Sequence, residues 1–158
     1  MEKINSLYHI TCVTHNSRVS NRMKHYNIKT EAPVKLNQEQ EIILTRIFYE
    51  IVKENQYTIL AYNVCCDHIH FIIFCENEML PQIICKIKSV SSHRFKELVK
   101  IPTTLWAQKF NRKIVDKDER LTNAINYINN NRLKHDLPEN IEVEQIASKI
   151  VIPIEKIV

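Results

Sequence analysis

The chain has 158 residues, 44% of them hydrophobic and 25% charged, with a formal net charge of +4. These values are typical of one globular domain. Glycine is absent, which excludes the glycine-dependent phosphate loops of P-loop proteins and dinucleotide-binding folds. The sequence contains neither the apolar segment of a signal peptide nor the roughly 18 apolar residues of a membrane span, so we expect a cytoplasmic protein that does not bind membranes.

Strands and helices are predicted to alternate along the chain. Composition and periodicity predict, in order, a strand over 7–14, a helix over 37–55, strands over 56–64 and 68–75, a helix over 80–100, a strand over 105–115 and a helix over 118–133. The two middle strands are joined by Cys65-Cys66-Asp67 and form a hairpin with Asp67 as its turn residue. An antiparallel sheet with helices packed on it is an α+β fold of ferredoxin-like type.

The last predicted helix and the residues after it complete this outline. Asp116 and Glu119 stand three residues apart, as an N-cap residue and its reciprocal glutamate do, and predict the start of that helix. One domain is expected over residues 1–137. Residues 138–158 form a C-terminal extension with a short helical pattern over 142–150, and the sequence leaves its packing open.

Two histidines stand out in the apolar stretch CCDHIHFIIFC, residues 65–75. His68 and His70 are two residues apart in a predicted strand, so their side chains project from one face of the sheet. Two imidazoles about 7 Å apart along a strand can bind one divalent ion if a third ligand comes from elsewhere. The alternative is that both are hydrogen-bonded, half-buried side chains, as isolated His-X-His pairs usually are.

Two polar residues lie one helical turn apart in the last predicted helix. The apolar residues of this helix share one face, namely Leu121, Ala124, Ile125 and Ile128. Tyr127 and Asn131 flank that face, which places both at the edge of the interface between helix and sheet. A tyrosine at such an edge is usually a packing residue with its hydroxyl group in water, and this alternative stays open from the pattern alone.

Positive charge is concentrated in one part of the chain. Between residues 86 and 113, eight basic residues and one acidic residue give a local charge of +7. Phe95, Trp106 and Phe110 lie among these charges, and this combination suits a phosphate backbone with bases available for stacking. The alternative is a solvated helix face with no ligand.

Three stretches resemble the IS200-like single-tyrosine transposases, which carry a histidine–hydrophobic–histidine (HUH) motif. They are YHITCVTHNSR in the first strand, AYNVCCDHIHFII in the hairpin, and WAQKFNRKIVDKDERLTNAINYINNNRLKHDL near the C-terminal end. Together they span residues 7–137. The Tyr-Ile-X-X-Asn arrangement is closer to the REP-associated branch of this family than to the insertion-sequence branch, where glutamine is expected in place of the asparagine.

The resemblance implies an enzyme, a site and a substrate. Tyr127 is the implied nucleophile, and His68, His70 and Asn131 are the implied ligands of a Mg²⁺ or Mn²⁺ ion. The implied activity is cleavage and joining of single-stranded or hairpin DNA through a 5′-phosphotyrosine intermediate. Members of the insertion-sequence branch act as dimers that exchange tyrosine helices, so a homodimer is one expectation.

Basic residues in the first loop and in the segment 86–113 are the candidates for DNA backbone contacts. They are Arg18, Arg22, Lys24, Lys86, Lys88, Arg94, Lys109, Arg112 and Lys113. His9, on the first strand, either borders the same site or faces the core, and we expect it to face the core.

The sequence departs from the family at two positions. Cys65-Cys66-Asp67 stands where the family usually has methionine, proline and asparagine, and Arg132 stands where proline commonly follows the asparagine. A non-catalytic, domesticated hairpin-DNA-binding module with the same fold is therefore the alternative function. A third possibility, a zinc domain using Cys65, Cys66, His68 and His70, lacks a Cys-X-X-Cys pair and would crowd its ligands into one hairpin.

Overall fold

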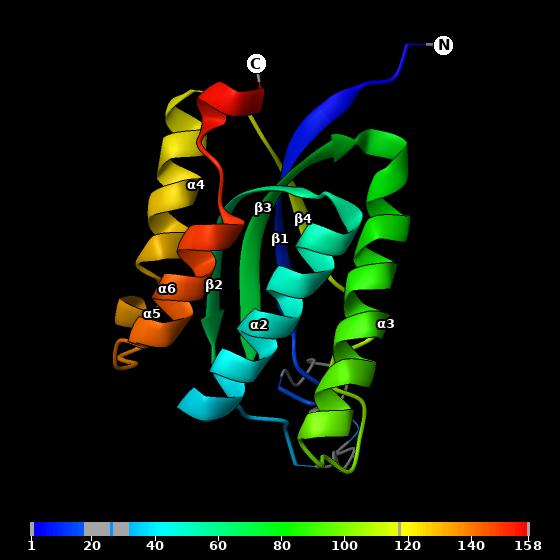
Figure 1. Cartoon of the computed structure of the whole chain (residues 1–158), viewed down its shortest axis with the longest axis vertical. Helices are drawn as coiled ribbons and strands as arrows, with labels where there is room; N and C mark the ends of the chain where they lie inside the picture. Colours follow the sequence, from blue (N-terminus) through cyan, green and yellow to red (C-terminus); the bar gives the residue numbers. More distant parts are fainter. Residues whose placement is uncertain (1, 18–25, 27–31, 117, 158) are drawn as a thin grey trace.

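A four-stranded antiparallel sheet forms the centre of the protein in this computed structural model, which describes residues 2–17, 26, 32–116 and 118–157. The strands are β1 (Asn5–Val13), β2 (Thr58–Cys65), β3 (His68–Glu76) and β4 (Asn111–Val115), in the spatial order β2-β3-β1-β4. With helices packed on this sheet (Figure 1), the predicted α+β fold of ferredoxin-like type is confirmed.

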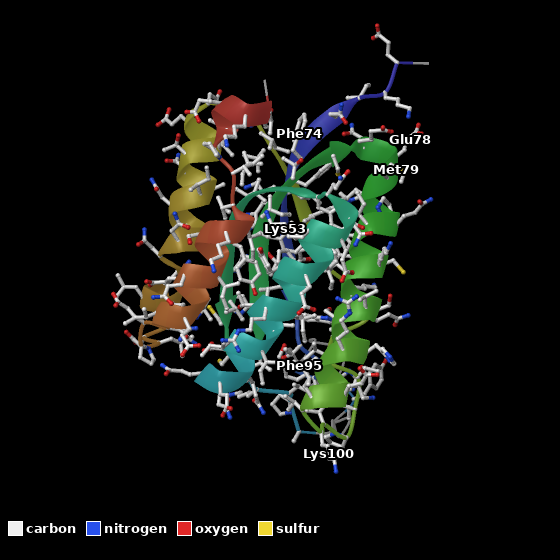
Figure 2. All side chains as sticks on the ribbon, in the orientation of Figure 1. Lys53, Phe74, Glu78, Met79, Phe95 and Lys100 are labelled. Carbon is white, nitrogen blue, oxygen red and sulfur yellow. The ribbon has the colours of Figure 1, made fainter. Side chains whose placement is uncertain are left out.

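One face of the sheet is covered by α2 (Gln38–Asn55) and α3 (Leu80–Leu98), which lie side by side in Figure 1. α2 begins at Asn37, whose side chain accepts a hydrogen bond from the Gln40 N–H while the Gln40 side chain accepts one from the Asn37 N–H. This reciprocal cap satisfies amides that the helix leaves unpaired. The short 3-10 helix η1 (Asn77–Met79) leads into α3, and Figure 2 shows Met79 and Lys100 at opposite ends of α3.

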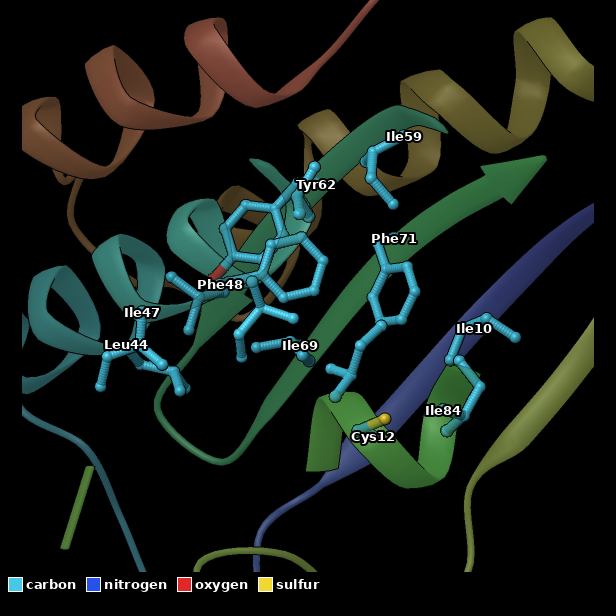
Figure 3. Packing of buried hydrophobic residues seen from close by; sticks show 14 of the residues in the cluster. Ile10, Cys12, Leu44, Ile47, Phe48, Ile59, Tyr62, Ile69, Phe71 and Ile84 are labelled. Atoms are coloured by element: carbon cyan, nitrogen blue, oxygen red, sulfur yellow. The ribbon is translucent and has the colours of Figure 1, made fainter. Parts of the chain in front are cut away.

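An aromatic group lies at the centre of the core between α2 and the sheet (Figure 3). The ring centroid of Phe48 is 4.6 Å from that of Tyr62 and 5.1 Å from that of Phe71. The buried Tyr62 hydroxyl lies 3.0 Å from Thr45 Oγ1, which satisfies its hydrogen-bonding group. Tilted ring pairs of this kind add to the stabilisation that burial alone gives.

The opposite face of the sheet is covered by α4 (Glu119–Asn129). Leu121 and Ile128 of this helix are buried against Leu7 of β1 and Ile72 of β3. This smaller apolar cluster fixes α4 over the sheet face from which His68 and His70 of β3 project.

The start and the end of α4 differ from the prediction. The N-cap is Asp118, whose side chain accepts from the Arg120 N–H, while Asp116 forms an ion pair with the Arg120 guanidinium at 3.0 Å. The predicted N-cap at Asp116 was therefore wrong by two residues. The helix is interrupted at Asn130 (φ −97°, ψ 7°), and a short helix, α5 (Asn131–Lys134), follows.

The strand predicted over 105–115 is shorter, beginning at Asn111, and lies at the sheet edge instead of in the core. Leu105 and Trp106 are buried, with Trp106 Nε1 donating to Ser91 Oγ of α3 at 2.8 Å. The carbonyl groups of residues 107–109 all accept hydrogen bonds from Lys88 Nζ. Three consecutive carbonyls directed at one ammonium group are incompatible with the alternation of a strand.

The C-terminal extension packs on the domain. Its helix α6 (Ile141–Ile150) places Val143 and Ile150 in the main core beside α2. After α6 the backbone pairs with β2, since the Ile152 N–H donates to the Ile59 carbonyl at 2.9 Å, and a 3-10 helix, η2 (Ile154–Ile157), follows. None of the described helices has the length and apolar content needed to cross a membrane.

Without glycine, other residues occupy the left-handed backbone region. Asn16, Gln56 and Asp136 have φ angles of 61°, 55° and 54°. Asparagine and aspartate tolerate this region better than other residues that carry a Cβ atom. Gln56 is the C-cap of α2, a position where glycine is common in other proteins.

The Ile128→Ala variant should lose about 2 to 5 kcal/mol of unfolding free energy, because its fully buried side chain joins α4 to the sheet. Urea unfolding monitored by circular dichroism measures this loss. Ile141→Ala, at an exposed position of α6, is the matched control and should change stability by less than about 0.5 kcal/mol. Equal losses in the two variants would contradict the packing of α4 described here.

Candidate active site

Polar side chains gather on the face of the sheet that α4 covers. Thr11 of β1 lies opposite His70 of β3, and His9 of β1 lies opposite Lys113 of β4. Alternate residues of a strand share a face, so these four side chains and His68 project from the same side of the sheet. The predicted shared orientation of the two HUH histidines is present in the structure.

His68 is buried, and both ring nitrogens have close partners. Nδ1 lies 2.7 Å from Oδ1 of Asp67, to which it donates a hydrogen bond. Nε2 lies 2.8 Å from Oδ1 of Asn131. Asp67 is thus both the turn residue of the hairpin and the carboxylate that orients His68, the role that carboxylates take behind metal-binding histidines.

Asn131 is fully buried at the start of α5. Its Oδ1 atom accepts a hydrogen bond from Cys65 Sγ at 2.9 Å besides facing His68, whereas its Nδ2 atom is buried with no partner among the described residues. With Nδ1 of His68 protonated toward Asp67, Nε2 of the neutral ring is an acceptor, as is the Asn131 oxygen. Two acceptors 2.8 Å apart repel each other unless a proton or a cation lies between them.

His70 is held from the β1 side. Its Nδ1 atom lies 3.0 Å from His9 Nε2 and 2.9 Å from Thr11 Oγ1. Its ring stands edge-on to His68, with the centroids 4.7 Å apart. The cross-strand pairing of β1 and β3 therefore fixes the orientation of the second HUH histidine.

His9 lies in this site, so the prediction that it faces the core was wrong. Tyr8 and Ile10 face the core instead, and the alternation of the strand turns His9 toward α4. Burial, together with the positive charge of Lys113, lowers the pKa of His9 below its ordinary value of 6.5. This shift favours the neutral ring, which can either donate to or accept from His70.

Tyr127 projects from α4 toward the histidines. Its ring centroid lies 5.6 Å from that of His70 and 6.0 Å from that of His9, and its side chain is 41% exposed. Lys134 Nζ lies 4.7 Å from the centre of the same ring, within the range of a cation–π contact. Tyr127 thus stands at the helix–sheet edge, as the helical pattern predicts, whereas Asn131 lies beyond the break at Asn130 and is fully buried instead of lying at the edge.

A pocket of about 660 Å³ opens between β4, β1 and α4. Its lining includes His9, Thr11 and His70 of the sheet and Tyr127 of α4. The lining also includes three basic residues: Lys113, whose side chain shares the sheet face of His9, Arg112 beside it on β4, and Arg120 of α4. A tyrosine hydroxyl, imidazoles and several cations around one opening form an arrangement suited to a phosphate group.

Three residues of the site were missed from the sequence. His135 places its ring 5.3 Å from that of His68, and Lys134 covers Tyr127. Both follow Tyr127 by about two helical turns, a spacing that could have indicated them. Thr11 could have been found only from the register of β1 against β3.

The predicted DNA-binding residues divide into three groups. Arg112 and Lys113 line the pocket, and Lys109 is exposed in the loop before β4. On α3, three others have partners away from the pocket: Lys86 bonds Asn55, Lys88 bonds the carbonyls of residues 107–109, and Arg94 pairs with Glu50 and Glu54. Arg18, Arg22 and Lys24 lie outside the described residues.

The aromatic residues of the basic segment are less available for stacking than predicted. Phe95 is fully buried and Trp106 is buried beneath α3, so both belong to the core. Phe110 is half-buried in the loop before β4. Phe95 lies on the inner face of α3, whereas the charged residues around it in the sequence lie on the outer face.

The donor set at His68 suits a divalent cation only with the help of Asn131. In the part of the chain that the structure describes, no three His, Cys, Asp or Glu side chains form a group that could hold a metal. The zinc domain with Cys65 and Cys66 therefore lacks its ligand set. Two imidazoles, one amide oxygen and water suit Mg²⁺ or Mn²⁺, because these ions accept oxygen ligands and keep several waters.

Two solved structures have a similar fold. One is a REP-associated tyrosine transposase bound to a REP hairpin, with 17% identity and a TM-score of 0.56 over 85% of this chain and 72% of that one. The other, from Deinococcus radiodurans and assigned as a transposase, has 20% identity and a TM-score of 0.53 over 82% of this chain and 92% of that one. Curated protein sequences give no significant match.

The fold and the site together define a ferredoxin-like domain in which a helical tyrosine faces one histidine on each of the two central strands, His70 of β3 and His9 of β1. The family model described as transposase IS200-like matches residues 4–131. The chain belongs to the IS200-like transposase family. The match includes His68, His70, Tyr127 and Asn131 and ends before Lys134 and His135.

The pKa of His9 should lie below 6.5 in the metal-free protein and should rise in Lys113→Gln, which removes a nearby positive charge. A His with a lowered pKa contributes stability above the unfolded-state value, and this contribution is lost as pH falls toward the folded-state value. Unfolding free energy should therefore fall as pH drops below about 6.5, less steeply in His9→Gln.

NMR titration of the imidazole signals measures the pKa, and urea unfolding at several pH values measures the stability. Lys53→Gln, on the exposed side of α2, is the control and should leave the His9 titration unchanged. A His9 pKa at or above 6.5 would contradict the burial described here.

Proposed function

We propose that this chain is a metal-dependent endonuclease and strand transferase that cleaves single-stranded DNA at hairpin ends through Tyr127. The position of Tyr127 carries this proposal. Its ring lies against the His9 and His70 rings in the lining of a pocket that also has basic residues, while Asn131, four residues further, contacts His68. Membership of a transposase family supports DNA as the substrate.

In the proposed step, the hydroxyl oxygen of Tyr127 attacks the phosphorus atom of a DNA phosphodiester. A bond forms between this oxygen and phosphorus, and the bond between phosphorus and the 3′ oxygen breaks. The phenol proton passes to solvent, and the leaving oxygen takes up a proton to become a free 3′-hydroxyl. The 5′ end remains on Tyr127 as a phosphotyrosine, which another 3′-hydroxyl can attack to rejoin strands without ATP.

Charged side chains around Tyr127 suit this reaction. Lys134 Nζ lies over the ring of Tyr127, 4.7 Å from its centre, so a positive charge stands beside the group that loses its proton. Lys113, whose side chain shares the sheet face of His9, lines the pocket where the phosphate would lie. Fixed positive groups stabilise the negative charge that accumulates on a phosphate during transfer, because they need no reorganisation when the charge develops.

His68, His70 and Asn131 would hold a Mg²⁺ or Mn²⁺ ion. When bound, such an ion polarises a non-bridging phosphate oxygen and makes phosphorus more open to attack. His70 uses Nδ1 toward His9 and Thr11, so the ion would bind its Nε2 atom. Asp67 keeps the proton on Nδ1 of His68, so Nε2 is again the ligand.

Single-stranded DNA at a hairpin end suits the shape of the site. The pocket lies on an open sheet edge beside β4, where one strand can reach Tyr127 without a duplex entering a deep groove. Exposed cations on β4 can contact the strand backbone, an interaction that does not depend on base sequence. The structural similarity to a transposase solved with a REP hairpin supports the same class of ligand.

The alternative is a hairpin-DNA-binding module that has lost cleavage. The observation in its favour is the Cys65 thiol, which donates to the same Asn131 oxygen that would bind the ion. Such a module would bind hairpin DNA without a metal requirement and would form no covalent product.

Incubation with labelled single-stranded hairpin DNA and Mn²⁺ should give a covalent protein–DNA adduct, visible on a denaturing gel. The adduct should be absent with EDTA, which removes the metal, in Tyr127→Phe, which lacks the nucleophile, and in His68→Ala, which lacks a metal ligand. Tyr49→Phe on α2 and His93→Ala on α3 lie far from the site and are the matched controls. An adduct in Tyr127→Phe would exclude this nucleophile, and tight binding without any adduct would favour the non-catalytic module.

Binding of the same DNA should weaken in Lys113→Ala, and its salt dependence should become shallower. The slope of log K against log salt should fall by about 0.7 for each phosphate that the variant no longer neutralises. Arg94→Ala, whose guanidinium is paired with Glu50 and Glu54, should change neither quantity. Fluorescence anisotropy at several salt concentrations measures both. A larger effect from Arg94 than from Lys113 would place the DNA on the α3 side instead.

A further inference from the structure

Arg132, which replaces the proline common in this family, is almost completely buried. Its side chain is the centre of a hydrogen-bonded group, the Arg132 network, which consists of Arg132, Glu41 of α2, Asn140 and the carbonyls of Val64 and Pro138. Arg132 donates from Nη1 to Glu41 Oε2 at 2.6 Å and to the Val64 carbonyl at 2.9 Å. Nε and Nη2 both donate to the Pro138 carbonyl, at 2.9 and 2.7 Å.

The carboxylate of Glu41 is also fully engaged. Its second oxygen, Oε1, accepts from Asn140 Nδ2 at 3.3 Å, and the same amide donates to the Gln38 carbonyl at 3.1 Å. Glu41 is 2% exposed. The Arg132 network therefore joins four segments, namely the first turn of α2, the end of β2, α5 and the start of α6.

Two adjacent residues of α5 contact two adjacent residues of β2. Arg132 donates to the Val64 carbonyl, and Asn131 accepts from the Cys65 thiol. The Asn131 oxygen that Cys65 contacts is the one 2.8 Å from His68 Nε2. Moving Arg132 would thus move Asn131 relative to His68.

Stability alone is a weak reason for this arrangement. A buried ion pair loses so much hydration that apolar residues of similar size often stabilise a protein equally well. By contrast, α5 has four residues, and a helix this short does not hold its own position in water. Contacts with the Arg132 network therefore hold α5 in place.

We propose that Arg132, paired with Glu41, is a positioning residue that holds the Asn131 amide oxygen against His68 and so sets the affinity of the site for its divalent ion. The proposal rests on the proposed function. Groups behind metal ligands act through orientation, and their loss typically weakens metal binding or activity about 10-fold to 100-fold.

The test uses Arg132→Met, Arg132→Lys and the double variant Glu41→Leu/Arg132→Met. Arg132→Met leaves the Glu41 carboxylate buried and unpaired, so it should lose both stability and Mn²⁺ affinity. The double variant removes both charges and should regain thermal stability while its Mn²⁺ affinity stays about 10-fold or more below wild type. Arg132→Lys keeps the charge for Glu41 but cannot reach both carbonyls, so its Mn²⁺ affinity should lie between those of wild type and Arg132→Met.

Mn²⁺ binding is measured by electron paramagnetic resonance without DNA, and thermal unfolding is measured by calorimetry. The rate of adduct formation is measured as a function of Mn²⁺ and DNA concentration. Arg46→Met is the matched control, since Arg46 makes an exposed ion pair between α2 and Glu142 of α6. It should leave all three measurements unchanged.

The outcomes separate this proposal from the proposed function. If the double variant recovers Mn²⁺ affinity together with stability, or if Arg132→Met binds Mn²⁺ as wild type does, the positioning role is wrong. If the Arg132 variants bind Mn²⁺ more weakly than wild type, as expected, but wild type forms no adduct, the positioning role stands and the proposed catalytic function fails.

Discussion

The pairing of β1 with β3 is the constraint on which the site depends. This register places Thr11 opposite His70 and turns His9 to the same face, so that His70 Nδ1 has two hydrogen-bonding partners on β1. A shift by one residue would exchange the two faces of β1. It would bury His9 among the core side chains of α2 and α3 and place Ile10 beside His70. The alternation of β1 therefore places its apolar side chains in the core and, at the same time, its polar side chains in the site.

Charge divides the molecule in a similar way. On the α3 side, cations of the basic segment have local partners, such as Glu50 and Glu54 for Arg94. On the β4 side, Arg112 and Lys113 line the pocket with Tyr127. A potential that attracts DNA depends on cations whose charge is not already balanced by neighbouring carboxylates. The local charge of +7 in the sequence therefore overstates the positive potential at the surface of α3, where neighbouring groups pair with the cations. The count also does not show that the pocket receives its cations from β4.

Much of the fold could be predicted from the sequence, because strand alternation and helical spacing are local signals. The same signals predicted that His68 and His70 share a face and that Tyr127 and Asn131 lie at the edge of a helix. They failed where distant groups decide the local structure. Lys88 binds three carbonyls of the segment that was expected to begin the fourth strand. His9 lies beside His70 because β1 pairs with β3, and the sequence of one strand does not show such pairing.

The C-terminal segment has a consequence for the order in which the site is assembled during synthesis. Pro138 and Asn140 complete the hydrogen bonds of Arg132 and Glu41, and Ile150 packs against the core beside α2. A nascent chain exposed only to residue 137 already contains the histidines and Tyr127 but lacks these partners. Such a chain can carry the cationic pocket before Asn131 is fixed. Translation of the extension would then fix Asn131 only after the residues that line the pocket have been made.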